Sequence, residues 1–270
     1  MILEKTLEHI KQIFQIHEII PPKVTKIVIG LGYTGVRVSA YGSESVIGLA
    51  STLSSLITSD ECSKVNFAGD LTNKNLLELL EWSYLPPSLK RIIGIATLNA
   101  VSQYILKIQN PYFKVEEDLV DYLGLNLDTK ITIIGLMKPL IRKLSKKTLN
   151  ITLVEDRIKK PLEFNKFDFH SNIDELNEED LSTDILFCTG TVLINNTIEK
   201  ILDLFRGIAR KIIVIGPSVG LLPDILFEYG VDIVGGMEIL DTKATLKVLQ
   251  EGGGTQMFKN FGKKYNLLNK

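Results

Sequence analysis

The sequence has few of the side chains that bind soft metals or cross-link a chain. Its 270 residues include two cysteines, Cys62 and Cys188, and three histidines, His9, His17 and His170. Neither cysteine stands in a Cys-x-x-Cys pair or beside a histidine, which argues against a disulfide framework and a cysteine-based structural zinc site. His9 and His17 are eight residues apart on a predicted helix, too far for one local chelate, and His170 lies in a polar stretch, so a solvated or capping role explains each of them better than metal ligation does.

Excess charge of either sign and long apolar runs are also absent from the sequence. The 31 Lys and Arg residues nearly balance the 32 Asp and Glu residues, for a formal net charge of −1. This balance argues against a nucleic-acid binder or a polybasic membrane binder. No uncharged apolar run reaches the roughly 18 residues of a membrane helix, and the first residues lack the order of a signal peptide. We expect a cytoplasmic protein without a nucleic-acid or membrane partner, and leave homo-oligomer formation open.

The first part of the chain mixes helical and strand patterns. The composition, 45% hydrophobic and 23% charged, is that of a globular protein, and the length suits about two domains. Apolar spacing predicts helices over 2–19, 72–82 and 88–108. Period-two alternation predicts strands at 24–29, 36–40 and 46–50. We therefore expect a small α+β domain over residues 1–115.

The second part of the chain has a regular αβ pattern. Residues 110–129 are an acidic, weakly periodic stretch that we expect to be a linker at the domain boundary. After it, short apolar runs alternate with helix-length amphipathic segments; the runs are 131–134, 151–154, 184–188, 211–215 and 231–234. Such runs are typical of parallel strands that are covered by helices on both faces. The sequence predicts an α/β protein whose second domain, 116–270, is a Rossmann-like parallel sheet.

Two glycine motifs invite a functional interpretation. Residues 30–35 (GLGYTG) match the dinucleotide pattern GxGxxG, but strand-like alternation follows instead of a helix, so a hairpin is the better interpretation. Residues 216–220 (GPSVG) match the nucleophile elbow GxSxG, yet every histidine precedes Ser218 and a hydrolase is disfavoured. For this segment we keep two alternatives, a helix N-cap and a cradle of backbone N–H groups that binds an anion.

The carboxyl ends of the predicted parallel strands should carry the ligand site, because ligands bind there in open parallel sheets. These ends are glycine-rich, small and polar, which suits a small polar or anionic ligand. The expected ligand-binding residues are Glu155, Thr189, Gly190, Thr191, Asn195, Thr197, Gly216, Pro217, Ser218, Gly236 and Asp241, joined across a cleft by Arg37, Asp70 and Asn99 of the first domain.

Several of these residues also have a purely structural interpretation. Asp241 precedes an amphipathic stretch and suits a helix N-cap. Asp70 and Asn99 could serve in capping or in core hydrogen bonds. The candidate metal ligands are Glu155, Glu238 and Asp241, whose oxygens suit a hard cation.

The same residues carry a family resemblance. SLKR at 88–91, GIATLNA at 94–100, TGT at 189–191 with Asn195 and Thr197, GPS at 216–218, and Gly235-Gly236 with Asp241 resemble the uncharacterised prokaryotic family labelled "putative heavy-metal chelation". The resemblance runs from about residue 5 to 260. It implies a first domain similar to the N-terminal domain of enolase, a Rossmann-like second domain and a ligand cleft between them. The implied role is heavy-metal chelation or a step near anaerobic cobalamin and tetrapyrrole metabolism.

The residues and the family label point to different metal chemistry. Soft metals prefer thiolate and imidazole, whereas the expected site offers mostly oxygen atoms, so a metal could arrive already bound in an organic ligand. Our first hypothesis is a protein whose interdomain cleft holds a small polar ligand, which could be a divalent or heavy metal ion or a metal complex; whether it is an enzyme stays open. The second is a Rossmann-type transferase or oxidoreductase with a nucleotide-derived cofactor, in which Glu155 would contact the ribose. The third is a non-catalytic scaffold or sensor.

Overall fold

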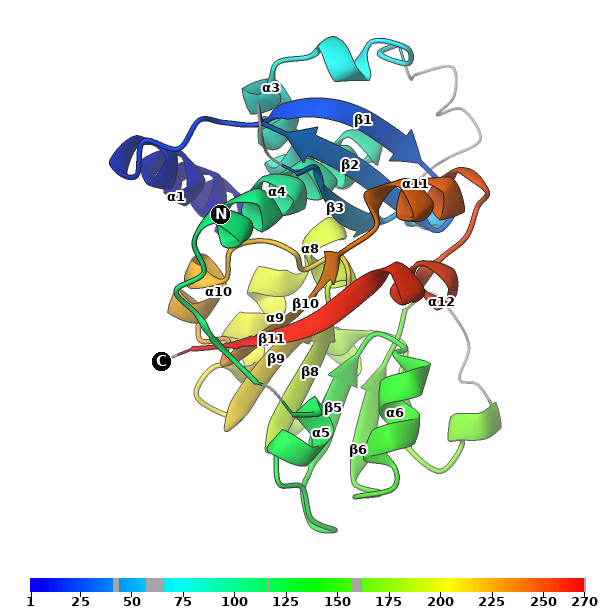
Figure 1. Cartoon of the computed structure of the whole chain (residues 1–270). Helices are drawn as coiled ribbons and strands as arrows, with labels where there is room; N and C mark the ends of the chain where they lie inside the picture. Colours follow the sequence, from blue (N-terminus) through cyan, green and yellow to red (C-terminus); the bar gives the residue numbers. More distant parts are fainter. Residues whose placement is uncertain (41–43, 57–65, 116, 157–161, 270) are drawn as a thin grey trace.

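The computed structural model describes residues 1–40, 44–56, 66–115, 117–156 and 162–269. Two sheets organise it, a three-stranded sheet in the upper part of Figure 1 and an eight-stranded sheet in the lower part. No helix of the described residues is both long and apolar enough to cross a bilayer. The molecule is therefore the expected small α+β part followed by a larger α/β part.

The small sheet is an antiparallel meander of β1 (Lys23–Ile29), β2 (Tyr33–Ser39) and β3 (Val46–Ser51). The GxGxxG segment forms the β1–β2 turn, where the Gly30 N–H donates to the Tyr33 carbonyl, so the predicted hairpin is confirmed. Helix α1 (Ile2–Ile16) ends three residues earlier than expected, and Glu18 takes a φ of 52°. The predicted helix at 72–82 contains a shorter α3 (Leu76–Glu81), which is flanked by 3₁₀ turns.

Helix α4 (Leu89–Ile108) is the central element of the fold. It is buried all round from Arg91 to Ile105 and packs on β2, β3 and α8, which explains why its sequence lacks a polar stripe. The Ser88 side chain caps its first turn by accepting from the Arg91 N–H. Gly48 lets the helix approach β3, because a Cβ there would lie 2.1 Å from the Ala100 nitrogen. α4 thus lies between the two sheets.

The large sheet has the order β4-β11-β10-β9-β8-β5-β6-β7. Its strands are β4 (Phe113–Lys114), β5 (Ile131–Ile134), β6 (Ile151–Val154), β7 (Asp168–His170), β8 (Ile185–Thr189), β9 (Lys211–Ile215), β10 (Ile233–Ile239) and β11 (Gly262–Leu268). From β7 to β10 all neighbours are parallel, whereas β11 and β4 pair antiparallel at one edge. The chain order reverses between β5 and β8, as in a Rossmann sheet.

Short helices connect these strands: α5 (Leu119–Tyr122), α6 (Lys138–Leu144), α7 (Glu178–Leu181), α8 (Thr191–Ile194), α9 (Ile198–Phe205), α10 (Asp224–Glu228), α11 (Thr242–Gln250) and α12 (Thr255–Phe258). One hydrophobic cluster contains residues of both parts, including Val36 and Leu98 from the first and Val214 and Leu222 from the second. The two sheets therefore share a core.

The large sheet begins at β4, just before the expected boundary at 115/116. Phe113 and Lys114 pair with Leu268 and Leu267 of β11. The stretch that we expected to be a linker therefore supplies the edge strand of the large sheet and, a few residues later, helix α5.

Candidate functional site

The carboxyl ends of β5, β8 and β9 meet where the strand order reverses. A Cβ on Gly135, which has a φ of +95°, would lie 2.3 Å from the Thr189 Cγ2. The Gly190 N–H donates to the Ile215 carbonyl, and the Gly216 N–H donates to the Gly235 carbonyl, each over 2.9 Å. We call Gly135, Thr189, Gly190, Thr191, Gly216 and Pro217 the rim.

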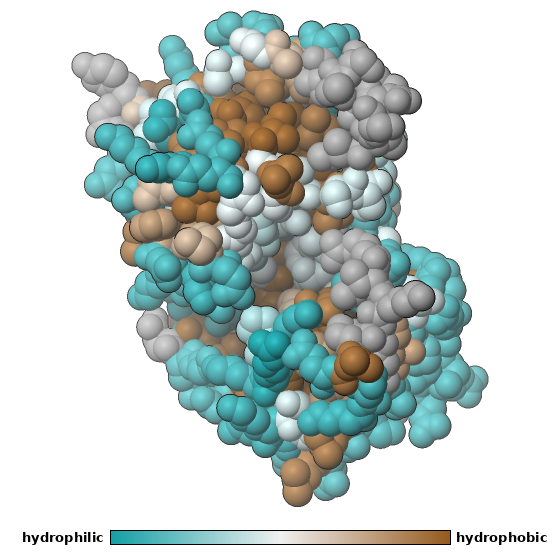
Figure 2. Space-filling model, turned by 90° about the vertical axis from the view of Figure 1, so that its right-hand side faces the viewer, coloured by the Kyte–Doolittle hydropathy of each residue, from teal (hydrophilic) through white to brown (hydrophobic). Residues whose placement is uncertain are grey.

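The rim lies where the backbone is accessible and bulky side chains are absent. Gly190 is buried, but Thr189, Thr191, Gly216 and Pro217 are partly exposed. Figure 2 views the molecule from the side of α6 and α12 and shows a hollow between the upper and lower parts, with much weakly polar surface beside it. Small hydroxyl-bearing residues and glycines suit a small polar ligand.

Glu155 follows β6 and is part of the protein framework. Its side chain is 5% exposed, and its Oε2 accepts from the Leu136 N–H over 2.9 Å. This bond fixes the turn between β5 and α6, a helix of seven residues with Pro139 in its first turn. The turn has one glycine, Gly135, instead of the glycine-rich fingerprint of dinucleotide sites.

Ser218 is a buried residue of the 216–220 turn, which contacts the small sheet. Its Oγ accepts from the Ser51 N–H over 2.9 Å, and the Val219 N–H donates to the Gly216 carbonyl. Helix α10 begins only at Asp224, so our interpretation of Ser218 as a helix N-cap is wrong. The strand–turn–helix geometry on which the anion cradle depended is absent as well.

Asn99 connects this turn to β3. Its Nδ2 donates to the Leu49 carbonyl over 2.7 Å and to the Ser218 carbonyl over 3.0 Å, and the residue is fully buried. Its Oδ1 has no hydrogen-bond partner. One helical turn later, the Gln103 Nε2 donates to the Gly220 carbonyl. Two amides of α4 therefore hold the 216–220 turn, and that of Asn99 also joins it to β3.

Arg91 is a buried cation that our list of site residues omits. Although 3% exposed, its guanidinium donates to the carbonyls of Leu85 and Leu193 and to the Asn196 Oδ1, over 2.6, 2.7 and 2.8 Å. Burial lowers its pKa to about 10, so it stays charged at neutral pH. It fixes the segment that follows α8, where Asn196 takes a φ of 63°. The sequence could have indicated a special role for Arg91, because it is a basic residue inside a mostly apolar helix.

Other expected site residues lie apart from the rim. Arg37 donates from Nε to the Thr25 Oγ1 on neighbouring β1, and exposed Asp70 accepts from the Asn73 side chain. Asp241 follows β10, beyond its last pairing with β9, and caps α11 by accepting from the Ala244 N–H over 2.9 Å. Its structural interpretation as an N-cap is therefore confirmed.

The remaining expected residues occupy neighbouring parts of the large sheet. The Thr197 Oγ1 donates to the Asn195 Oδ1 beyond α8. Gly236 lies inside β10 opposite Tyr265, and Glu238 is exposed farther along the same strand. The structure thus brings Thr189, Thr191 and the 216–218 turn together with Asn99, but leaves Arg37, Asp70 and Asp241 elsewhere.

The described residues do not offer the donor set that a bare soft metal requires. Among them, no group of three or more His, Cys, Asp or Glu side chains is placed to hold an ion. Cys188 is fully buried in β8, and burial raises the pKa of its thiol, which opposes the thiolate form. His9 and His170 face Asp224 and Asp180, each over 3.4 Å. Cys62 lies outside the described residues.

Comparisons with known proteins agree with this architecture. A curated protein of Methanocaldococcus jannaschii, described as uncharacterized, is 29% identical over 209 residues, 72% of each chain. A Pyrococcus horikoshii structure of unknown function from the DUF364 family is 24% identical, with full coverage of both chains and a TM-score of 0.76. A Desulfitobacterium hafniense structure of the same family is 17% identical, with 98% and 99% coverage and a TM-score of 0.73. The similarity to these two structures shows a shared fold.

Two family models match separate parts of the chain. Both carry the description "Putative heavy-metal chelation", and they match residues 15–102 (DUF4213) and 118–268 (DUF364). The second match alone covers more than half of the sequence. The chain therefore belongs to the family described as "Putative heavy-metal chelation".

Proposed function

We propose that this protein binds a small polar molecule at the rim, and that any heavy metal enters as a complex with an organic ligand. The observation that carries this proposal is the meeting of the carboxyl ends of β5, β8 and β9 at the reversal of strand order. Open parallel sheets bind ligands at this place.

The chemistry of the rim favours a complexed metal over a bare ion. Hydroxyl groups of Thr189 and Thr191 and backbone groups of the glycines can bind carboxylates, amides or phosphates on the outside of a complex. They are poor ligands for a soft cation, which prefers thiolate and imidazole. Asn99 adds a buried amide oxygen without a partner, close to the 216–220 turn.

Native mass spectrometry combined with elemental analysis of gently purified protein tests this proposal. We expect a retained organic mass, with or without a metal, that is lost on denaturation. Thr189→Val should reduce the retained fraction, because it removes a rim hydroxyl at nearly constant volume. Thr242→Val, at the start of α11 and outside the rim, is the matched control. A retained bare metal ion, or equal loss from both variants, would contradict the proposal.

A nucleotide-derived cofactor is the second candidate, and one observation favours it. The order β7-β6-β5-β8-β9-β10 is that of a dinucleotide-binding sheet, with Glu155 directly after β6, where ribose is often bound. In this chain, however, the Glu155 carboxylate already accepts from Leu136. A rise in melting temperature with nicotinamide or adenosyl cofactors, absent with metal complexes, would favour this candidate.

A further inference from the structure

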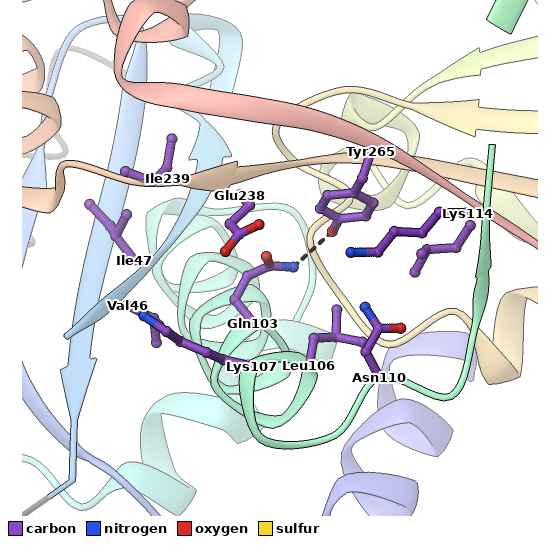
Figure 3. A pocket seen from close by; sticks show the side chains of 11 residues that line it. Val46, Ile47, Gln103, Leu106, Lys107, Asn110, Lys114, Glu238, Ile239 and Tyr265 are labelled. Carbon is purple, nitrogen blue, oxygen red and sulfur yellow. Dashed lines mark hydrogen bonds between the residues drawn. The ribbon is translucent and has the colours of Figure 1, made fainter. Parts of the chain in front are cut away.

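A second pocket lies at the C-terminal end of α4 and shares no residue with the rim. Its volume is about 250 Å³, and its lining comes from β3, α4, β4, β10 and β11 (Figure 3). Both parts of the molecule therefore contribute to it. Sites for drug-sized ligands span roughly 300–1,000 Å³, so this pocket suits a small metabolite.

A fixed hydrogen-bond pair crosses the pocket. The Gln103 Nε2 donates to the Tyr265 Oη over 2.7 Å and to the Gly220 carbonyl over the same distance. Because both Nε2 protons are used and the Tyr265 Oη accepts one of them, the phenol O–H is available to a ligand. Burial raises the pKa of Tyr265, which keeps this O–H protonated at neutral pH. The Gln103 amide oxygen is a nearby acceptor.

Two opposite charges face this pair. Figure 3 shows the Lys114 ammonium and the Glu238 carboxylate extending toward Gln103 and Tyr265 from different sides of the pocket. Within the described ranges, neither side chain has an ion-pair partner within 4.0 Å. Lys107, by contrast, is paired with Glu44. As far as the described residues go, the pocket thus offers one cation and one anion without an ion-pair partner.

These charges limit the ligands that the pocket can hold. A simple anion would satisfy Lys114 but would also face Glu238, and a simple cation would face Lys114. A ligand that carries both charges can satisfy the two side chains at once. Apolar walls from Val46, Ile47 and Ile239 leave room for a short aliphatic group.

We propose that this pocket binds a small zwitterionic aminocarboxylate with a short aliphatic side chain. Its carboxylate contacts the Lys114 ammonium and the Tyr265 O–H. Its ammonium group contacts Glu238 and the Gln103 amide oxygen, and its aliphatic group packs on Ile47 and Ile239. The residues of α4 and β4 in this pocket, Gln103 to Lys114, lie between the two ranges that the family models match.

Calorimetric titration of the full chain with L-valine and L-leucine tests the proposal. Isovalerate, which lacks the ammonium group, and isobutylamine, which lacks the carboxylate, are the single-charge probes. We expect saturable binding of at least one amino acid, and at least about tenfold weaker binding of both single-charge probes, the ratio that a lost charged hydrogen bond gives. Absence of saturable binding for both amino acids, or equal affinity for isovalerate, would overturn the proposal.

Variants assign the binding to this pocket. Lys114→Met and Glu238→Gln should each weaken amino-acid binding about tenfold or more. Lys263→Met is the matched control, because Lys263 lies opposite Glu238 in the register of β10 and β11 but does not line the pocket. Unchanged circular dichroism verifies that each variant is folded. An equal loss of amino-acid binding in the Lys263 variant would contradict the assignment. Thr189→Val should leave amino-acid binding unchanged, which distinguishes this pocket from the rim.

Discussion

Gly48 lies where β3 crosses α4, and the space there excludes any side chain. A Cβ would come within 2.1 Å of the Ala100 nitrogen and 2.3 Å of the Ala96 carbonyl oxygen. Both are backbone atoms of a buried helix and cannot move alone. We expect Gly48→Ala to lower the free energy of unfolding by about 3 kcal/mol or more, at or above the usual upper limit for overpacking, as measured by urea denaturation.

Gly254→Ala is the control for this substitution. Nothing lies within 4 Å of a Cβ at that position, and its φ of −118° is open to any residue. Its free energy of unfolding should stay within about 0.5 kcal/mol of the parent protein. A Gly48 variant as stable as this control would show that α4 can move away from β3.

At the scale of single residues, the sequence could predict which side chains are unusual but not what they contact. Asn99 stands in an apolar helix, so its need for partners was predictable, whereas the Leu49 and Ser218 carbonyls come from distant segments. The cap at Asp241 depends on neighbours in sequence and was predictable in full. Ser218 shows the opposite case, because its partner Ser51 is 167 residues away.

Helices α1 and α10 are joined by a titratable cluster. The His9 Nε2 lies 3.4 Å from the Asp224 Oδ2, and the Tyr112 hydroxyl donates to the same oxygen over 2.5 Å. The hydrogen bond to Asp224, with a smaller contribution from Glu228, raises the pKa of His9 above 6.5. The protonated form of His9 is therefore favoured in the folded protein.

This cluster gives a pH-dependent contribution to stability. Because the folded-state pKa of His9 is raised, its contribution is fully present below pH 6.5 and is lost as the pH rises through the folded-state pKa. Both side chains are about 30% exposed, so about 0.5–1 kcal/mol is expected. His9→Gln should lose this amount near pH 6 and little near pH 8.5 in urea denaturation. His17→Gln is the control, and an equal loss at both pH values would contradict the prediction.

At the scale of elements, short buried strands were the most predictable features. β5, β6 and β9 have the bounds that their apolar runs predict, because a strand covered on both faces needs a continuous apolar sequence. β11 was missed because its sequence, GKKYNLL, is half exposed and has no clear alternation. β4 and β7 are too short to give a pattern. The antiparallel edge, and with it the second pocket, could not be predicted.

The shared core predicts that the whole molecule unfolds in one step. One cluster contains residues of the small sheet, α4 and the large sheet, and hydrogen bonds from Asn99 and Gln103 reinforce the contact. Trp82, the single tryptophan, lies in the first part, so its fluorescence reports that part, whereas far-ultraviolet circular dichroism reports both. We expect coincident urea transitions from the two probes. Separate midpoints would indicate two independent folding units.

The two-part α/β architecture was predictable from the change of hydrophobic period along the chain. The relative placement of the two parts was not, because it depends on contacts between distant segments, such as the hydrogen bonds from the Ser51 N–H to the Ser218 Oγ and from the Asn99 Nδ2 to the Ser218 carbonyl. The likeness of the first part to the enolase N-terminal domain stays an expectation. So do the ligand and the chemistry of the rim.

The Gln103–Tyr265 hydrogen bond joins residues that are 162 positions apart. During synthesis, Gln103 cannot form this hydrogen bond until β11 has been made, long after α4. The second pocket is complete only when β11 has paired with β10 and β4. A molecule that binds there recognises the finished chain and not its precursors. By mass action it would stabilise only the completed fold, so its concentration in the cell would influence how much of the newly made protein persists.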